Sequence, residues 1–439
     1  MVIGRGKSPS AQETFMQMAQ ASGLRGRVLV TIGLLLLARI GIAIPIPGIN
    51  RAAFSSALQG SSGLGGGVLG LVDTFSGGGL SAVGIFALGI LPFINASIII
   101  QLLTAALPSL EDLQKNEGEA GRRKISQITR YVALGWGALQ GTALAIFANN
   151  FAYEPGTFFI IKVVVALAAG SMFVMWLGEL ITERGIGNGA SLLIFVNIVA
   201  TLPSSLGNTI ELAQTDQNAV GGIVILALVF LITIVGIVFV QEGTRRIPIV
   251  SARRQVGKRI RAEKSSYLPL RLNQGGVMPI IFASTVLVLP SFIAGAARNE
   301  TVTRITNYLQ PGGPTPWIYA LFYLTLILFF SYFYASLVVN PVDMAQNLKK
   351  MGSSIPGIRP GRATSEYVGR VLNRLTFLGA IFLGLVAIVP TAVEGATRVQ
   401  TFQGFGATSL LILVGVAIDT SRQVQTYVIS QRYEGMVKQ

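Results

Sequence analysis

Long apolar runs constrain this chain more than any other feature of its sequence. A helix needs about 20 apolar residues to cross the ~30 Å hydrocarbon core of a bilayer. Runs of that length recur along the 439 residues, and only 12% of the residues are charged, whereas soluble domains carry about 25% charged residues. The sequence therefore predicts an all-α polytopic membrane protein. An apolar segment of this length that crosses the bilayer makes all its backbone hydrogen bonds within itself by forming a helix.

The apolar runs number ten. Eight of them are long, and two are short and begin with glycine-rich stretches. The ten predicted transmembrane helices lie near residues 28–44, 83–107, 131–148, 158–178, 186–202, 220–240, 275–296, 317–339, 375–390 and 405–418. An even number of crossings places both termini on the same side of the membrane.

Lysine and arginine are distributed unevenly between the two sides. Twenty-seven of the 34 basic residues fall on the side of the termini, and four fall on the opposite side. Basic loops are retained in the cytosol, so the segment 1–27 and the tail 422–439 are predicted to be cytosolic. Topology is then the primary explanation of the net charge of +15, which in a soluble protein would suggest nucleic-acid binding.

Two connections, residues 241–274 and 340–374, are longer than a turn between helices requires. They hold nine and six of the basic residues. Connections of this length are usually functional or unstructured. Two interpretations stay open: solvated hairpins whose charges only orient the protein, or a docking surface for an anionic partner.

Short matches between the two parts of the chain indicate an internal repeat. The fifth run opens GNGASLLIFV at Gly187, and the tenth opens GFGATSLLILV at Gly404. The second run holds ILPFINAS from Ile90, and the seventh holds VMPIIFAS from Val277. Five spans in each set make the repeat inverted, and matched glycine- or proline-interrupted spans point to the working site of such proteins.

The repeat predicts two pseudo-symmetric inverted five-helix halves, 28–203 and 204–421, whose spans two, five, seven and ten converge. Uncharged side chains from the repeats gather at this convergence: Ile90, Ile94, Ile194, Ile281 and Ile412. The first two share a helix face, because residues four apart do. These isoleucines are either ordinary lipid- or core-facing residues, or an apolar constriction that blocks ions by dewetting.

Groups that perform bond chemistry are missing from the sequence. The chain has no cysteine and no histidine, which removes thiol nucleophiles, histidine bases and histidine-ligated metals. The tripeptide GKS at 6–8 lacks the earlier glycine and the preceding strand of a phosphate-binding loop. We therefore expect no enzyme activity, no cofactor and no metal, and we expect energy to come from a partner.

Arg39 is the clearest charge inside a predicted span. An ionisable residue in a membrane is a functional candidate, although its charge can also snorkel to the interface or pair within the bundle. A small-solute secondary transporter normally needs carboxylates or histidine at mid-membrane, and their scarcity argues against that class. A membrane scaffold or insertase without a through-pore is the second alternative.

The loop after the first span holds an apolar segment between two glycine stretches. GLGGG at 63–67 and SGGG at 76–79 lie on either side of VLGLVDTF at 68–75. Glycine adopts backbone conformations that other residues avoid, so the segment between these stretches can swing. The alternative is an external loop without such a role.

Six motifs then follow one another along the chain. They are RIGIAIPIPGI (39–49), FSGGGLSAVGIFALGILPFINASIIIQLL (75–103), GEAGRRKISQITRY (118–131), MWLGELITERGIGNGASLLIF (175–195), NPVDMAQNLKKMGSSIPGIRPG (340–361) and GATSLLILV (406–414). In this order they resemble the SecY protein-conducting channel of the bacterial translocon, over nearly the whole chain. The resemblance implies a central hourglass pore between the two halves. Unfolded preproteins would cross the membrane through it, and hydrophobic segments would leave it sideways.

The resemblance also implies roles for individual residues. The hydrophobic pore ring of the family falls on Ile90, Ile94, Ala190, Ile194, Ile281 and Ile412, where Ala190 departs from the usual bulky residue. The plug that closes the channel from outside falls on residues 68–82, beginning with Val68, Leu69, Leu71, Val72, Asp73, Thr74 and Phe75. The lateral gate, which admits signal sequences, falls near Gln101 and Asn273.

Partners follow from the same resemblance. The connections 241–274 and 340–374 look like the cytosolic loops that bind the motor ATPase SecA or the ribosome. The implied docking residues are Arg245, Arg246, Arg253, Arg254, Lys258, Arg259, Lys349, Lys350 and Arg359. Two small membrane subunits, SecE-like and SecG-like, are expected beside the chain, with signal-sequence-bearing polypeptides as substrates and bilayer lipid around it. The expected location is the bacterial plasma membrane, with the thylakoid membrane as the alternative.

Overall fold

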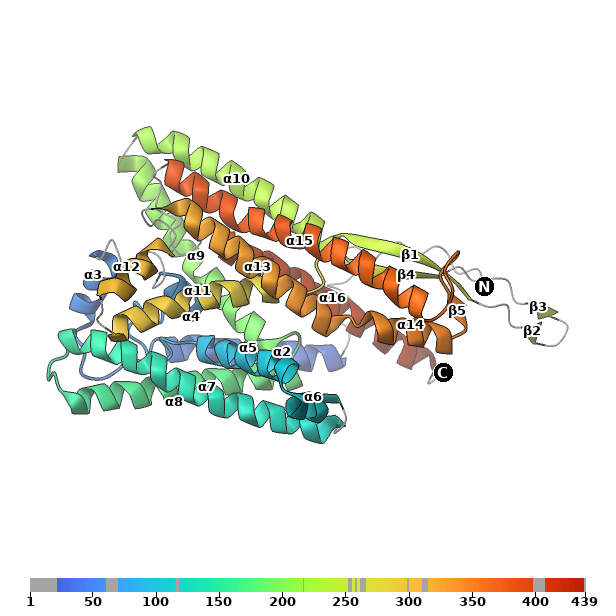
Figure 1. Cartoon of the computed structure of the whole chain (residues 1–439). Coiled ribbons are helices and arrows are strands. Elements are labelled where there is room, and N and C mark those ends of the chain that lie inside the picture. The colour runs from blue at the N-terminus through green and yellow to red at the C-terminus, as the bar shows by residue number, and fades with distance from the viewer. Residues whose placement is uncertain are drawn as a thin grey trace.

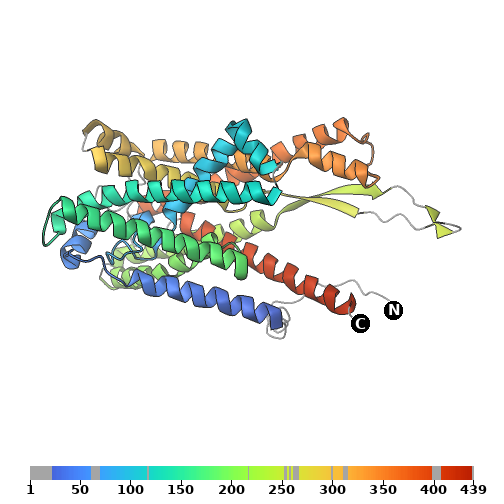
Figure 2. The same cartoon turned by 90° about the horizontal axis from the view of Figure 1, so that it is seen from below.

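The computed structural model describes residues 22–60, 70–115, 118–215, 217–251, 255–256, 259–260, 266–297, 300–309, 315–397 and 407–437. Long helices lie side by side and form the body of the molecule (Figure 1; Figure 2). Strands β1 (Thr244–Ser251) and β4 (Ser266–Arg271) extend beyond one end of the bundle, here called the sheet end. Helices α3 (Arg51–Gly60) and α12 (Glu300–Tyr308) lie at the opposite end, here called the far end.

The N-terminal half contributes five long helices, which are α2 (Ser22–Ile42), α5 (Leu91–Ala106), α7 (Gly118–Ala148), α8 (Thr157–Arg184) and α9 (Gly189–Thr215). Four shorter pieces join them, which are α3, α4 (Gly70–Ser76), α6 (Pro108–Lys115) and a 3-10 turn (Asn149–Phe151). The long helices are apolar over most of their circumference, as expected where one face meets other helices and another meets lipid.

The C-terminal half contributes the other five, which are α10 (Gln217–Glu242), α11 (Met278–Ala297), α13 (Pro316–Val338), α15 (Arg362–Thr397) and α16 (Ala407–Val437). Helix α14 (Pro341–Lys350) follows α13 at the sheet end. The halves meet through contacts of α11 with α5 and α7, and of α9 with α10 and α16.

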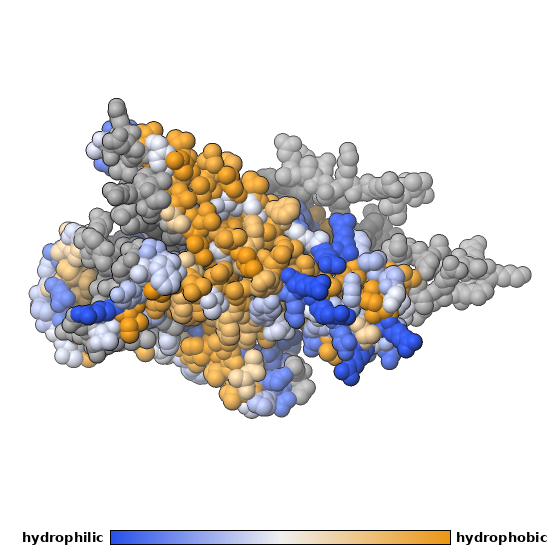
Figure 3. Space-filling view, turned by 45° about the horizontal axis from the view of Figure 1, so that its top comes forward, coloured by the Kyte–Doolittle hydropathy of each residue, from blue (hydrophilic) through white to orange (hydrophobic). Residues whose placement is uncertain are grey.

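Each of the ten predicted spans overlaps one of these helices. In the part of the chain that the structure describes, six helices are long and apolar enough to cross a membrane, or seven if α5 and α6, bent by 104° at their junction, count as one span. The fold is therefore a polytopic helical one, and the count of ten crossings stays a prediction. Figure 3 shows an apolar surface band over the middle of the bundle, with hydrophilic residues towards the ends.

The second predicted span is wrong at its start. The apolar run begins at Val83, but α5 begins at Leu91, and residues 77–90 form turns. Several of these residues have positive φ, including Gly77, Gly89 and Val83 itself. The stretch is apolar because it is buried inside the bundle, as Leu88 at 1% exposure illustrates, and not because it faces lipid.

The two long connections are not simple hairpins. Strands β4, β1 and β5 (Ser353–Ser354) form a three-stranded antiparallel sheet, in which Ile247 pairs with Leu268 and Val250 pairs with Ser354. A second two-stranded ribbon, β2 (Gln255–Val256) with β3 (Arg259–Ile260), extends from the first. The sheet packs on α15 through a separate buried cluster. The residues of this cluster are Ile247, Leu270, Ile355, Val368, Val371 and Leu375.

One large apolar core joins the two halves of the bundle. It runs from Ala38 of α2 to Val416 of α16 and contains residues of all ten long helices. A smaller cluster packs Leu24 of α2 against Val424 and Val428 of α16. The first and last long helices are therefore neighbours near the sheet end (Figure 2).

Candidate functional site

The four helices that carry the sequence repeat converge at the centre of the bundle. Helix α5 contacts α11, α11 contacts α16, and α16 contacts α9. The predicted ring residues of these helices belong to, or pack against, the same apolar core, and they are Ile90, Ile94, Ala190, Ile194, Ile281 and Ile412. The five isoleucines are at most 6% exposed, and Ala190 is half-buried. Residues more than 300 positions apart thus meet at one place.

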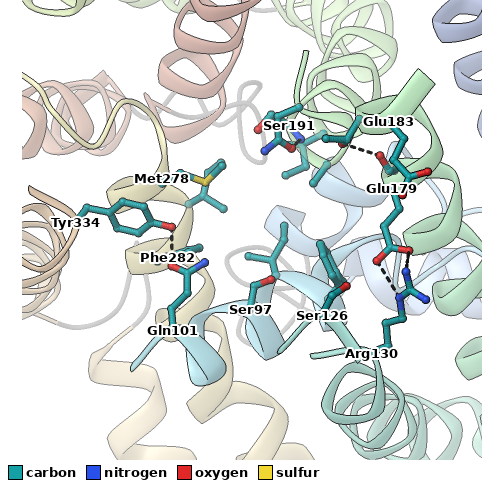
Figure 4. A pocket seen from close by; sticks show the side chains of 18 residues that line it. Ser97, Gln101, Ser126, Arg130, Glu179, Glu183, Ser191, Met278, Phe282 and Tyr334 are labelled. Atoms are coloured by element: carbon teal, nitrogen blue, oxygen red, sulfur yellow. Dashed lines mark hydrogen bonds and ion pairs between the residues drawn. The ribbon is translucent and has the colours of Figure 1, made fainter. Parts of the chain in front are cut away.

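A cavity of about 360 Å³ lies against this isoleucine cluster (Figure 4). Ile94, Ala190, Ile194 and Ile281 form part of its wall. Phe93, Met278 and Phe282 add apolar surface, and polar side chains from α5, α7, α8 and α9 also line it, among them Ser97, Ser126, Arg130, Glu179 and Ser191. The cavity is therefore amphipathic.

An ion pair lies among the residues that line the cavity. The Arg130 guanidinium on α7 lies 2.9 Å from the carboxylate of Glu179 on α8, and its Nε donates to the same carboxylate at 3.0 Å. Figure 4 shows both side chains beside the cavity. Sequence reasoning singled out neither residue, because nothing in the sequence pairs residues 49 positions apart.

The two predicted gate residues have different surroundings. Gln101 on α5 accepts a hydrogen bond from the Tyr334 hydroxyl on α13 at 2.9 Å, so it bridges the two halves. The Tyr334 ring also packs 5.2 Å from the Phe282 ring of α11. Asn273 instead donates to the carbonyl of Gly276 at 2.6 Å, within its own turn, and does not line the cavity. The structure therefore does not bring the two predicted gate residues together at the cavity.

The predicted plug includes the short helix α4. Val72 and Phe75 are 1% and 2% exposed and belong to the large core, and α4 packs against α9. The Asp73 carboxylate accepts hydrogen bonds from the Ser81 backbone N–H at 2.8 Å and the Ser81 hydroxyl at 2.6 Å. Thr74 is also buried and bonds to the Gly70 carbonyl.

Parts of the plug prediction fall beyond what the structure describes. Val68 and Leu69 lie outside the described residues, as does the glycine stretch 63–67. Leu71 lies in α4, but its side chain is not described. Of the second glycine stretch, 76–79, Ser76 ends α4 and residues 77–79 lie in the turn that follows it.

The predicted docking residues gather at the sheet end. Arg245 and Arg246 are exposed on β1, and the Arg246 guanidinium lies 5.0 Å from the Tyr267 ring centre. Lys349 and Lys350 are exposed at the end of α14, and Arg359 is exposed in the turn before α15. Arg259 lies in β3, and three further predicted residues, Arg253, Arg254 and Lys258, lie outside the described part.

The geometry defines a class of protein before any comparison is made. It is a helical membrane protein with two halves, a cavity lined by isoleucines from both halves, a short buried helix packed against α9, and a basic sheet at one end. Among the described residues, no group of three or more acidic side chains could hold a metal ion.

Comparison with known proteins identifies the family. The SecY family model matches residues 84–421. The protein translocase subunit SecY of Synechococcus elongatus is 75% identical over the full length of both chains, and that of Escherichia coli is 45% identical over 94% of both. The chain belongs to the SecY family. It is a protein-conducting channel and not an enzyme.

Solved structures of distant relatives share the fold. A structure described as that of a protein-conducting channel has a TM-score of 0.66 and 17% identity, with 91% of each chain covered. The Sec61 channel of a canine ribosome–channel complex has a TM-score of 0.60 and 16% identity, again with 91% of each chain covered. At such identities the likeness concerns the fold alone.

Proposed function

We propose that this channel translocates unfolded preproteins through the interface of its two halves and releases apolar segments sideways into the bilayer. One observation carries the proposal above all: isoleucines of both halves, Ile94, Ile194 and Ile281, line one cavity and belong to the same buried core as Val72 and Phe75 of α4. The halves correspond to residues 28–203 and 204–421. This arrangement supports a channel that is sealed at rest and has an entry vestibule on one side.

The seal at the centre is a ring of Ile90, Ile94, Ala190, Ile194, Ile281 and Ile412. An apolar constriction excludes ions because water leaves it, and an ion that entered would lose its hydration shell. Branched aliphatic side chains can also close around a passing polypeptide without binding any particular sequence. Residues 68–82 are the plug that supports this seal in the resting channel.

Lateral release occurs between α5 and α7 of one half and α11 and α13 of the other. Support comes from the Tyr334–Gln101 hydrogen bond, which joins α13 to α5 at the edge of the cavity. One net hydrogen bond contributes only about 1 kcal/mol, so a signal sequence that offers its own apolar surface can separate the helices. Gln101 is thus a gate residue together with Tyr334. Asn273 makes no such contact between the halves, because it bonds within its own turn.

The basic surface at the sheet end docks the source of energy. Its residues include Arg245, Arg246, Lys349, Lys350 and Arg359, which are exposed. Positive charge of this density attracts acidic protein surfaces and RNA phosphates. We assign it to a SecA motor or a ribosome, and two distant structural relatives are ribosome-bound channels.

The remaining assignments concern the surroundings of the chain. The sheet end and both termini face the cytosol, because the basic residues concentrate there. SecE-like and SecG-like subunits cover part of the exposed apolar surface, which includes Leu228, Leu231 and Val235 of α10. The membrane is the bacterial plasma membrane, or a thylakoid membrane, since relatives at 75% identity come from cyanobacteria.

Ion leak tests the central assignment. Replacing Ile94, Ile281 and Ile412 together by serine should raise the conductance of resting channels in planar bilayers, because a wetted constriction no longer excludes ions. A triple change of Phe158, Ile161 and Val165 to alanine, on an exposed face of α8, is the control. Unchanged conductance in a channel that still translocates preproteins would contradict the ring.

A charge reversal tests the docking surface. Arg359→Glu should reduce motor-driven export into inverted vesicles, because it repels an acidic partner at the sheet end. Arg51→Glu, at the far end, is the matched control and should leave export unchanged. Undiminished export by the Arg359 variant would rule out this residue as a docking contact.

A further inference from the structure

Two polar side chains hold the carbonyl end of α4. Arg39, in the last turn of α2, donates from Nη1 to the Gly77 carbonyl at 3.0 Å. Asn197 of α9 donates from Nδ2 to the Phe75 carbonyl at 2.8 Å. The last carbonyls of a helix lack intrahelical partners, so these donors satisfy groups that would otherwise be buried without a hydrogen bond.

The positive charge of Arg39 lies at the C-terminal end of α4. A cation is favoured at the negative, C-terminal end of a helix, and charge-assisted hydrogen bonds are about twice as strong as neutral ones. Arg39 is half-buried and Asn197 is 7% exposed, so water competes poorly for either donor. The intramembrane arginine is thereby accounted for by a contact across elements rather than by snorkelling alone.

Gly77 makes the contact sterically possible. Its φ is +71°, and a Cβ built there would collide with the Arg39 guanidinium and with the Asn197 side-chain amide. The neighbouring Gly78 has a similar φ of +84°, but a Cβ there would meet nothing within 4 Å. The two adjacent glycines therefore have similar φ values, but only Gly78 has room for a Cβ.

Asn197 also connects this contact to the isoleucine cluster. It lies three residues after Ile194 and seven after Ala190 on α9, so the three share one helix face. Any movement of α9 that widens the ring must carry the Asn197 amide with it. The hydrogen bond to the Phe75 carbonyl would then lengthen and break as the ring opens.

We infer that Arg39 and Asn197 are positioning residues that form a latch, which holds α4 against α9 at rest and opens when α9 moves with the ring. The inference rests on the proposed role of residues 68–82 as the plug. It adds the contacts that hold the plug in place and a route by which a chain entering the ring releases it.

Cysteine labelling can test the latch, because the chain has no cysteine of its own. Val72→Cys places a thiol on α4 at a side chain that is 1% exposed, and the full chain in proteoliposomes is then treated with a membrane-impermeant maleimide. Arg39→Gln or Asn197→Leu should raise the labelling rate of the resting channel about ten-fold or more, because each removes a buried hydrogen bond. Arg39→Lys, which keeps the positive charge, should give a labelling rate close to that of the channel with Arg39.

Two controls separate a latch from general loosening. Ala133→Cys on α7 lies in a different buried cluster and is 1% exposed, so its thiol should stay protected in every latch variant. Gly77→Ala should expose the thiol at position 72, whereas Gly78→Ala should do so much less. If thiols at 72 and 133 become reactive together, or the two glycine variants behave alike, the latch is refuted.

The proposed plug and the proposed latch can be contradicted by different measurements. A translocation intermediate trapped in the otherwise unchanged channel should make the thiol at position 72 reactive, and continued protection would contradict the plug. The resting rate in Arg39→Gln is measured without any substrate. A rate equal to that of the parent, in a channel whose thiol does become reactive with trapped substrate, would refute the latch and leave the plug standing.

Discussion

The equivalent helices α5 and α11 begin alike but are preceded by very different segments. Both carry proline in their first turn and place an isoleucine of the repeat, Ile94 or Ile281, in the same core. Before α5, residues 70–90 fold into the bundle and are held by polar contacts from α2 and α9. Before α11, strands β1 and β4 extend beyond the bundle and form a small separate core with the first part of α15.

This difference shows how one repeat serves two purposes. A segment buried between helices can close the space at their centre, and its polar contacts set how firmly it does so. A segment with a separate core can present charge to a partner without disturbing that closure. Perturbing the two segments should therefore give separable effects, and the following predictions proceed from the largest effect to the smallest.

Ile247→Ala should cause the largest loss of stability, and this loss should be confined to the sheet. The side chain is 2% exposed in the sheet cluster, and such a truncation costs about 2–5 kcal/mol. Hydrogen exchange should accelerate over β1 and β4 while resting conductance stays low. Tyr267→Ala, which removes a largely exposed ring of the same sheet, should change exchange little. Raised conductance in the Ile247 variant would mean that the two segments are coupled.

A matched pair of glycine changes should separate the two segments further. A Cβ at Gly84 would collide with the Ile42 carbonyl, and one at Gly379 would lie 2.6 Å from the Leu272 carbonyl. Overpacking of this kind costs about 1–3 kcal/mol. Both alanine variants should unfold at lower temperature in detergent, but only Gly84→Ala should raise the resting leak.

The control for this pair is Gly135→Ala on α7, where a Cβ would meet nothing within 4 Å. It should keep both the unfolding temperature and the low leak, since alanine favours a helix. Equal leak from the Gly84 and Gly379 variants would contradict the proposed division of labour.

Asp73→Asn should weaken the plug segment by a smaller amount. The carboxylate accepts two hydrogen bonds from Ser81, and the amide can accept only through its one oxygen, so about 1 kcal/mol should be lost. Hydrogen exchange should speed up over residues 77–84 and remain unchanged over β1 and β4. Ser81→Ala tests the same contact, and because it keeps the backbone N–H, it should lose less.

Tyr334→Phe should have the smallest effect, confined to the seam between the halves. It removes only the hydroxyl that donates to Gln101, at a cost of about 0.5–1 kcal/mol. We expect preproteins with defective signal sequences to be exported more readily, because less energy is needed to part α5 from α13. Tyr332→Phe, on an exposed side chain of the same helix, is the control and should not relax this selectivity.

The sequence predicted the helices far better than their contacts. The ten apolar runs each overlap a helix, and the repeat correctly indicated that α5, α9, α11 and α16 converge. It misjudged the start of α5, because the buried turns at 77–90 are as apolar as a span. It also missed the sheet, whose strand β5 is only two residues long and leaves no periodic pattern, and whose strands β1 and β4 lie in a connection that was interpreted through its charges alone.

The sequence by itself determined the class of the protein, since an apolar run of about 20 residues has few alternatives to a membrane helix and the family motifs are collinear. Only the tertiary structure decided which polar groups meet: Gln101 with Tyr334, Arg130 with Glu179, and Arg39 and Asn197 with the end of α4. The physical reason is that hydropathy is a local property of a segment. A hydrogen bond depends on distances of about 3 Å between atoms, and for these pairs only the packing of helices sets those distances.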